Sequence, residues 1–351
     1  MAGYYYGQLS KEKKAVYDML AAGCDALAAV IRVPDLGTEV LSDIYLRMKL
    51  DLPLLFFVTG FHYRKMPGAD HVEVLPDYLF DRGKVKMHRQ AVTARLERLA
   101  RPLKGKALAA RLDRLCRPAM GLNEGEKERY VHDFICRNVR YDKLKKPYSH
   151  EILGPLGQGV SVCEGIAKTV KALCDAVGLP CIVALSEAVP EIGVRYRHTW
   201  NVVTVEGQRY HVDATFDNSL QRGMKRYDYF NLDDRHIFRD HQRLVLPLPE
   251  CSGDKGYFYR SLSFTKTEDV EKRVRQALRK KQEHFVFHWR GGGLNQEILG
   301  QLLEKCAGAA AERGKTVGCS LNRAQAVIQL DFSDAPAGEV LVEEPDEGQK
   351  L

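Results

Sequence analysis

The chain of 351 residues is 45% hydrophobic and 28% charged, with 29 glycines and 14 prolines. This composition fits one large or two to three small globular domains, and it excludes fibrous, collagen-like and wholly disordered chains. The formal net charge of +7 would favour a nucleic-acid or membrane partner. However, residues 82–117 contain twelve Lys and Arg and only two acidic residues, a local charge of +10. The rest of the chain therefore has a net charge of about −3 (7 − 10).

The first 120 residues are predicted to form a helical region that contains one β-hairpin. Ser10 opens a helical pattern that continues to Val30, and a second helix is expected over residues 38–50. The extended runs at 54–63 and 71–75 flank a turn-forming segment with Pro and Gly, which is typical of a hairpin.

A basic segment, residues 82–117, closes this region. Its cations alternate with leucines at helical spacing, which predicts a pair of amphipathic helices with a solvated basic face. A surface for an acidic substrate or partner is the second interpretation of this segment, and nucleic-acid binding is the third. We expect neither a nucleic acid nor a membrane as a partner.

Several features predict a cytoplasmic location. The amino terminus lacks the basic start, apolar run and cleavage site of a secretory signal. The most apolar stretch, residues 52–61, is too short to span a bilayer. The nine cysteines are an odd number without a CxxC pair, which favours reduced thiols over disulfides or a structural zinc site.

Residues 121–250 are predicted to form the next domain. Asn123 and Glu126 have the spacing of a capping box, which predicts a helix through Asn138. A loop rich in Gly and Pro then leads to a helix that begins near Cys163. At the start of a helix, backbone N–H groups and the helix dipole stabilise a thiolate, so Cys163 is expected to be a better nucleophile than Cys174 in the middle of the same helix.

Three strand-like runs follow, at residues 181–188, 198–205 and 208–216. The last two are joined at Glu206-Gly207, a pair suited to a tight turn. In that hairpin His198 faces Thr215, and Asp213 is its diagonal neighbour on the same face of the sheet. An imidazole and a carboxylate are thus expected side by side, where the carboxylate would fix the tautomer of the imidazole and stabilise its cationic form.

The remaining residues are predicted to form a small α+β domain over 251–333 and a disordered acidic tail over 334–351. The run Arg290-Gly-Gly-Gly precedes a predicted helix and could form an anion-binding nest. It lacks the phosphate-loop pattern GxxxxGK[ST], so a flexible strand-to-helix turn is the favoured interpretation.

A thiol at the start of a helix, followed by a His and an Asp on one face of a sheet, provides a cysteine nucleophile with its base and orienting group. The sequence resembles the transglutaminase-like superfamily of papain-type thiol enzymes, in particular bacterial transglutaminase-like proteins. The resemblance lies in the motifs GVSVCEGIAKTVKALCDAVGLPC, RHTWNVV and YHVDATFDNS followed by YDYFNLDD, and upstream in RYVHDFICRNVRYD. It covers roughly residues 120 to 245.

The resemblance implies an α+β fold in which the nucleophile helix packs on an antiparallel sheet. It also implies that Cys163 is the nucleophile, His198 the general base and acid, and Asp213 the residue that orients the His. A peptide or amide carbonyl would form a thioester, and hydrolysis is favoured over transamidation (cross-linking) because transamidation needs a second, amine-binding site. No calcium-binding sequence of the animal transglutaminase type is evident, so we expect neither a metal nor a cofactor.

Supporting roles stay open at this point. The backbone N–H of Cys163 is expected to donate to the oxyanion, and three residues are candidates for a second donor: Gln158, Tyr141 and Tyr148. Three others are candidates for lining the cleft: Trp200, His211 and Glu164. A structural role is the favoured interpretation of His211, and a plain core position is the alternative for Trp200. The competing class of function is a non-catalytic module that keeps the fold and binds a peptide or partner.

Overall fold

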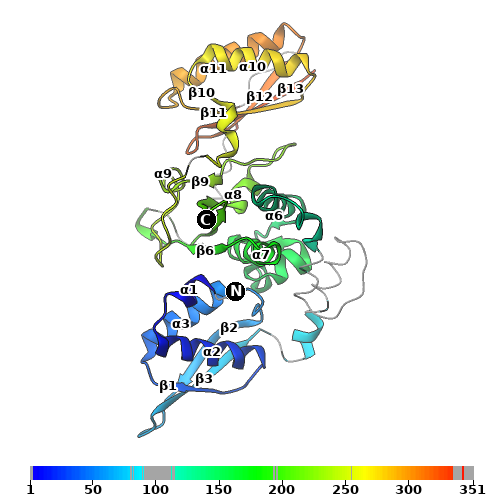
Figure 1. Cartoon of the computed structure of the whole chain (residues 1–351). Coiled ribbons are helices and arrows are strands. Elements are labelled where there is room, and N and C mark those ends of the chain that lie inside the picture. The colour runs from blue at the N-terminus through cyan, green and yellow to red at the C-terminus, as the bar shows by residue number, and fades with distance from the viewer. Residues whose placement is uncertain are drawn as a thin grey trace. The chain divides into compact units, whose positions relative to one another are not determined.

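The protein folds as a mixed α+β chain (Figure 1). The computed structural model describes residues 3–79, 81, 83–88, 90, 112, 115–192, 194, 197–253, 255–334 and 342–343. Most of the predicted basic helix pair lies outside these residues. The chain divides into two compact units, Met1–Leu185 with Thr199–Gly207, and Ser186–His198 with Gln208–Leu351. The sequence analysis divides the chain differently, at residues 120, 250 and 333, and those domain boundaries stay a prediction.

The first unit begins with three helices and a small antiparallel sheet. The helices are α1 (Tyr4–Gly7), α2 (Lys11–Asp25) and α3 (Thr38–Asp51). The sheet has the order β1-β3-β2, with β1 (Ile31–Pro34), β2 (Val58–Arg64) and β3 (His71–Tyr78). The predicted second helix and hairpin are therefore confirmed. The first helix ends at Asp25 rather than Val30, because the residues that follow it pair with β3 as strand β1.

The middle of the first unit contains two helices of 15 residues each, α6 (Glu124–Asn138) and α7 (Cys163–Val177). The predicted capping box is confirmed, since Glu126 N donates to Asn123 Oδ1 at 2.9 Å and Asn123 N donates to Glu126 Oε2 at 3.2 Å. Short elements lie before and between the two helices: η1 (Arg117–Ala119), β4 (Arg140–Tyr141), η2 (Pro147–His150), the π-helical turn η3 (Gly154–Gln158) and β5 (Val160–Ser161).

Helix α7 packs on the antiparallel pair β6 (Cys181–Leu185) and β7 (Thr199–Val205). Twelve of its 15 residues are buried, because β6 and β7, α6 and the preceding loop all contact it. The amino-terminal helices are fastened to the same layer, since Tyr5 Oη donates to the Val183 carbonyl of β6 at 2.8 Å. The amino-terminal region and the α7 layer therefore belong to one compact unit.

The second unit contains the antiparallel strands β8 (Gln208–Val212) and β9 (Phe230–Leu232) and three short helical elements, η4 (Pro190–Ile192), α8 (Ala214–Ser219) and α9 (Asp234–Ile237). Both residues of the predicted turn, Glu206 and Gly207, have a positive φ, at 49° and 77°, as a tight hairpin turn requires. The third predicted strand is wrong beyond Val212, because Asp213 caps a helix there and ends the strand.

The carboxy-terminal part of the second unit is an α+β layer pair (Figure 1). Its sheet has the order β10-β11-β13-β12-β14, and α10 and α11 pack together and against it around a shared apolar core. Val342–Glu343, within the predicted disordered tail, form strand β14 beside β12. The elements are η5 (Phe258–Leu262), β10 (Ser263–Phe264), α10 (Thr267–Arg279), β11 (His284–Trp289), α11 (Gln296–Ala311), β12 (Thr316–Asn322), β13 (Val327–Ser333) and β14 (Val342–Glu343).

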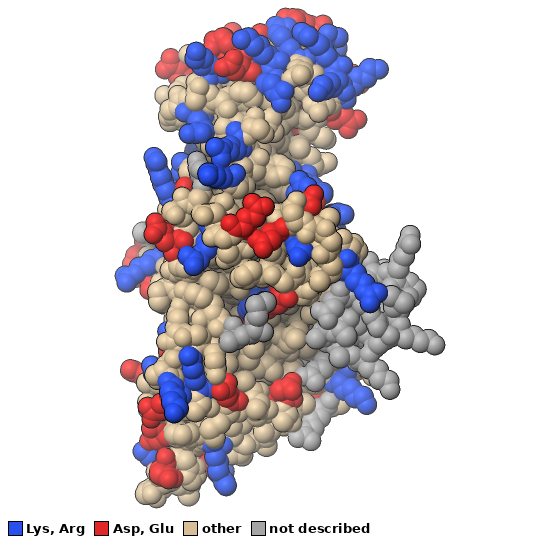
Figure 2. All heavy atoms as spheres, in the orientation of Figure 1, with Lys and Arg blue, Asp and Glu red and all other residues tan. Residues whose placement is uncertain are grey.

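The surface charges of the described residues are mixed. Figure 2 shows Lys and Arg side chains interspersed with Asp and Glu on the face that it draws. This mixture is consistent with the nearly neutral balance of the chain outside residues 82–117. None of the helices in the described part is long and apolar enough to cross a membrane.

Candidate active site

Cys163 is the first residue of α7 and is 7% exposed. The residue before it, Val162, is the N-cap and has no side-chain acceptor for the first N–H groups of the helix. No side-chain oxygen therefore screens the positive end of the helix dipole, and the thiol of Cys163 lies beside it.

The loop before α7 is packed tightly against the first turn of the helix. Ser161 Oγ donates to the Ser149 carbonyl at 2.8 Å, and β5 pairs in parallel with β4. A Cβ at Gly165 would collide with both the Ser149 carbonyl and the Ser161 hydroxyl oxygen. The small residues around the cysteine thus allow the loop to approach the helix closely and to hold Cys163 at a defined place.

A buried ion network supports the next turn of α7. Lys168 is fully buried, and its Nζ lies 2.8 Å from Glu151 Oε1 and 2.7 Å from Glu164 Oε1. Lys49 Nζ lies 2.9 Å from the same Glu151 oxygen. Burial lowers the pKa of Lys168, but the two carboxylates outweigh that effect and raise it above its usual value. The network is balanced in charge, with two lysines and two glutamates, as buried ions require.

Glu164, predicted to line the cleft, is one member of this network. Its second oxygen lies 3.1 Å from His150 Nδ1. Burial raises the pKa of Glu164, but Lys168 and His150 hold it well below its usual range. The structure therefore places Glu164 as an ionised partner of two basic groups at the start of α7.

His198 and Asp213 lie in direct hydrogen-bond contact, with 2.6 Å between His198 Nε2 and Asp213 Oδ2. His198 is 8% exposed and Asp213 is fully buried. Asp213 reaches this position as the N-cap of α8, where its Oδ1 accepts from Thr215 N at 2.8 Å and Phe216 N at 3.1 Å. One oxygen thus anchors the carboxylate to the backbone, and the other is directed at the imidazole.

A second imidazole, His241, binds the same carboxylate oxygen. His241 Nε2 lies 3.0 Å from Asp213 Oδ2, and its Nδ1 lies 2.8 Å from Asp240 Oδ1. Burial raises the pKa of Asp213, but attraction to His198 and hydrogen bonds from both histidines outweigh it and hold this pKa well below its usual range. Asp213 is therefore a stable anion that accepts four hydrogen bonds.

The ring of Phe216 encloses this cluster. Its centroid lies 4.7 Å from that of His198 and 4.9 Å from that of His241. The aromatic contacts keep the two imidazoles in fixed planes around Asp213. Since Nε2 of His198 is bound to the carboxylate, proton exchange with a substrate or nucleophile would take place at the other ring nitrogen, Nδ1.

His241 was missed by the sequence analysis. It lies 28 residues after Asp213 and outside both strands of the predicted hairpin. A local signal exists in the Asp240-His241 pair, because an adjacent acidic residue can orient an imidazole. The sequence pattern does not indicate that His241 contacts Asp213, because this contact depends on the path of the chain after α9.

The remaining predicted site residues have separate environments. Trp200, on β7, is 1% exposed, and His211, on β8, places its Nε2 2.7 Å from Asp234 Oδ1. Burial lowers the pKa of His211. The three candidate oxyanion donors lie on the loop before α7: Tyr141 on β4, Tyr148 on η2 with Lys146 over its ring, and exposed Gln158 at the end of η3.

Two groups of side chains among the described residues have donor atoms close enough for a metal ion, within 4.8 Å of one another. One is His198, Asp213 and His241, and the other is His211, Asp234 and Cys251. In both groups the histidines already hydrogen-bond the aspartate. Burial also raises the pKa of the Cys251 thiol to about 12, which opposes its use as a thiolate ligand.

Comparison with known proteins identifies the central part of the chain. Residues 106–214 match the model of the transglutaminase-like superfamily, and this range contains Cys163, His198 and Asp213. No curated protein matches the chain.

Among solved structures, the chain is similar to a cysteine protease candidate from Cytophaga hutchinsonii, with 14% identity and a TM-score of 0.27 over 45% of this chain and 62% of that one. It is also similar to a TGase, with 10% identity and a TM-score of 0.28 over 56% of this chain and 52% of that one. A protease candidate from Parabacteroides distasonis matches with 14% identity and a TM-score of 0.24 over 44% and 35%. The chain covers less than two thirds of each.

Proposed function

We propose that this protein, which belongs to the transglutaminase-like superfamily through residues 106–214, is a cysteine enzyme that hydrolyses a peptide or amide bond. In this proposal Cys163, His198 and Asp213 act in one site as nucleophile, general base and acid, and orienting carboxylate. The observation that carries the proposal is the buried His198–Asp213 hydrogen bond of 2.6 Å, because a carboxylate in that place stabilises the imidazolium that forms when a thiol gives up its proton.

The first half of the proposed reaction forms a thioester. The Cys163 thiol transfers its proton to His198 Nδ1 while its sulfur bonds to the substrate carbonyl carbon, and the carbonyl π electrons move to oxygen. The backbone N–H of Cys163, at the start of α7, is the proposed donor to that oxyanion. The intermediate then collapses, the carbon–nitrogen bond breaks, and the leaving amine takes the proton from His198.

The second half releases the acid. A water molecule gives a proton to His198 as its oxygen bonds to the thioester carbonyl, and the carbon–sulfur bond breaks. The departing thiolate regains its proton from His198, which restores the starting state. Hydrolysis is proposed rather than transamidation because water is always available, whereas an amine acceptor needs a binding site of its own.

The chemistry of four of the other eight thiols supports Cys163 as the reactive one. Burial raises the pKa of Cys24 and Cys319 to about 11 and that of Cys306 to about 12. The pKa of Cys174 on α7 is raised well above its usual value, first by a hydrogen bond with Cys181 and then by burial. These thiols carry almost no thiolate near neutral pH, so they are poor nucleophiles.

The test is competitive labelling of the full chain with limiting iodoacetamide near neutral pH, followed by mass spectrometry of the nine cysteine peptides. Cys163 should react first, and the signal should vanish in Cys163→Ala while it persists in Cys174→Ala. A peptide-library screen with the same variants then tests hydrolysis. Uniform labelling of all cysteines, or peptide cleavage that survives Cys163→Ala, would contradict the proposal.

A further inference from the structure

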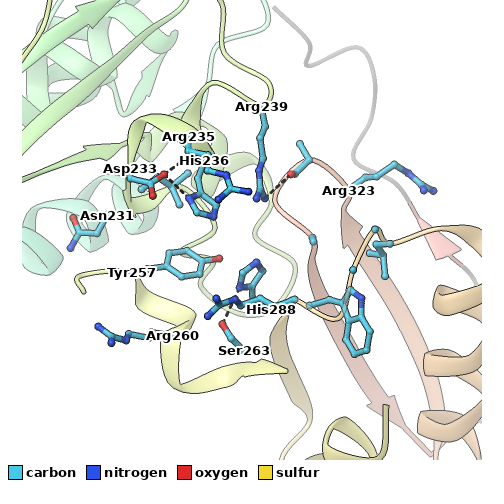
Figure 3. Close-up of a pocket in the computed structure, with 18 residues that line it drawn as sticks. Asn231, Asp233, Arg235, His236, Arg239, Tyr257, Arg260, Ser263, His288 and Arg323 are labelled. Atoms are coloured by element: carbon cyan, nitrogen blue, oxygen red, sulfur yellow. Dashed lines mark hydrogen bonds and ion pairs between the residues drawn. The ribbon is translucent and has the colours of Figure 1, made fainter. Parts of the chain in front are cut away.

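A cavity of about 810 Å³ lies within the second unit (Figure 3). Its lining residues include neither His198 nor Asp213. Four segments line it: the β9–α9 stretch, the η5–β10 stretch, the loop after β11 and the turn after β12. Five arginines are among the lining residues: Arg235, Arg239, Arg260, Arg290 and Arg323. No lysine is among them, and Asp233 is the single carboxylate in this lining set.

The positive charge of this lining is poorly compensated. Asp233 is already engaged, because its Oδ1 lies 2.5 Å from His236 Nδ1 and also accepts from His236 N at 2.8 Å. Arg235, Arg260 and Arg290 form no ion pair with any carboxylate in the described part of the chain, and all three are exposed. The lining therefore carries a charge excess of about four, five arginines less one aspartate, at a concave site.

Two buried side chains form part of the cavity wall. His288 is 6% exposed, and its pKa is lowered to about 4, first by burial and then by His236, Arg239 and Arg290. Trp289 is 4% exposed, and its indole Nε1 is buried without an acceptor among the described residues.

The glycine run of the sequence analysis also reaches this cavity. Gly292 and Gly293 line it, and Gly292 has a φ of 103°, a conformation that favours glycine. The loop leads into the 16-residue helix α11, whose N-cap is Asn295. Backbone without side chains at this place allows a ligand to come close to the main chain before α11, while the helix start itself is capped by Asn295 Oδ1, which accepts from Ile298 N at 2.9 Å.

We propose that this cavity binds a small molecule that carries two or more phosphate groups. Its volume is in the range of small-molecule sites, roughly 300–1,000 Å³. Guanidinium groups match phosphate oxygens with paired hydrogen bonds, which a lysine cannot do. A single carboxylate would leave most of the charge excess unbalanced and one phosphate group about half of it, whereas a diphosphate or triphosphate brings several negative charges in one compact group.

An acidic peptide is the other source of several negative charges. Four carboxylates in a row require four residues of about 3.3–3.6 Å each when extended, so such a peptide would spread its charges over roughly 14 Å rather than place them in one compact group. The rings of Tyr257 and His288, which meet edge to face with centroids 5.2 Å apart and an interplanar angle of 84°, line the same cavity as the arginines. This arrangement fits a compact phosphate ester with an organic part.

The test is isothermal titration calorimetry of the full chain with inorganic tripolyphosphate and with ADP, at physiological salt. We expect binding in the micromolar range and a loss of about tenfold or more in Arg260→Gln/Arg290→Gln, because two charge-assisted contacts are removed. Arg279→Gln on α10 is the control for each single replacement, Arg260→Gln and Arg290→Gln, since it removes one charge from an exposed arginine outside the cavity, and it should change affinity less than about twofold. Cys163→Ala should bind normally, which separates this inference from the proposed catalytic function.

Thermal melting checks that the variants fold, and if the double variant does not, the two single variants are compared with Arg279→Gln instead. Quenching or a spectral shift of tryptophan fluorescence on binding is a second readout, because Trp289 lies in the cavity wall. The proposal is overturned if neither probe binds below 1 mM, if Arg279→Gln weakens binding as much as the cavity variants, or if tetraglutamate binds as tightly as tripolyphosphate.

Discussion

The starts of helices α7 and α8 use the same backbone groups in opposite ways. At α7 no side chain caps the helix, and a cysteine stands where the dipole favours an anion. At α8 the first N–H groups are taken by Asp213, which becomes a fixed anion with one oxygen directed at two imidazoles. An uncapped helix start can therefore activate a nucleophile, whereas a capped one can hold the group that orients a base.

The charged side chains around the two helix starts also have different roles. Around α7 two lysines and two glutamates neutralise one another in a buried network. Around α8 one carboxylate serves two titratable rings. The first arrangement contributes to the stability of the helix, and the second keeps a proton acceptor in a defined orientation.

The largest expected effect is that of Asp213→Asn on activity. Asparagine keeps the size of the cap but places an amide donor against either the backbone N–H groups or the two imidazoles. We expect kcat/KM for a selected peptide to fall by about 10²–10³-fold, because the imidazolium loses its counter-ion. Asp234→Asn is the matched control, since it alters the His211 pair on β8; a comparable loss there would mean that any His–Asp pair of this unit is equally important.

The next effect is on stability, and it concerns the α7 network. Lys168→Met removes the cation between Glu151 and Glu164, and we expect the free energy of unfolding to fall by about 3 kcal/mol, since a buried carboxylate is left uncompensated. Urea denaturation measures this change. Lys171→Met breaks a pair with the exposed Asp175 and should cost about 1 kcal/mol or less. Equal losses of unfolding free energy in the two variants would show that the buried network stabilises the protein no more than the exposed pair does.

A smaller effect is expected at His241. His241→Ala should lower kcat/KM by about tenfold, because Asp213 loses one of its two imidazole partners and His198 loses part of its support. His241→Gln should restore most of the activity, since the glutamine amide can donate to Asp213 Oδ2. If His241→Gln is as impaired as His241→Ala, the charge of the ring rather than its hydrogen bond is what matters.

The same residue gives a pH-dependent prediction for stability. Burial lowers the pKa of His241, but hydrogen bonds to Asp213 and Asp240 outweigh it and raise the pKa above its usual 6.5. A raised pKa in the folded state adds stability that is complete below pH 6.5 and is lost as the pH rises through the folded value. The difference in unfolding free energy between the wild type and His241→Gln should therefore shrink above pH 6.5, as urea denaturation at several pH values would measure.

Local patterns predicted those parts of the fold and site that depend on near neighbours. The capping box of α6, the start of α7 and the positive φ of the Glu206-Gly207 turn all follow from a few adjacent residues. The hairpin also predicted that His198 and Asp213 lie together, although Asp213 does so as a helix cap and not as a strand residue. That difference arises because an aspartate before a helix gains two backbone hydrogen bonds that a strand position would not provide.

The sequence by itself determined where the cysteine stands on its helix and which carboxylate accompanies His198, because helical and strand periodicity and turn chemistry act over a few residues. Only the tertiary structure decided that His241 shares Asp213, that Lys168 joins Glu151 to Glu164, and that four separate segments bring five arginines around one cavity. Such sets come from segments far apart in the chain. Their contacts depend on how packed elements meet, and no local repeat of residues encodes that.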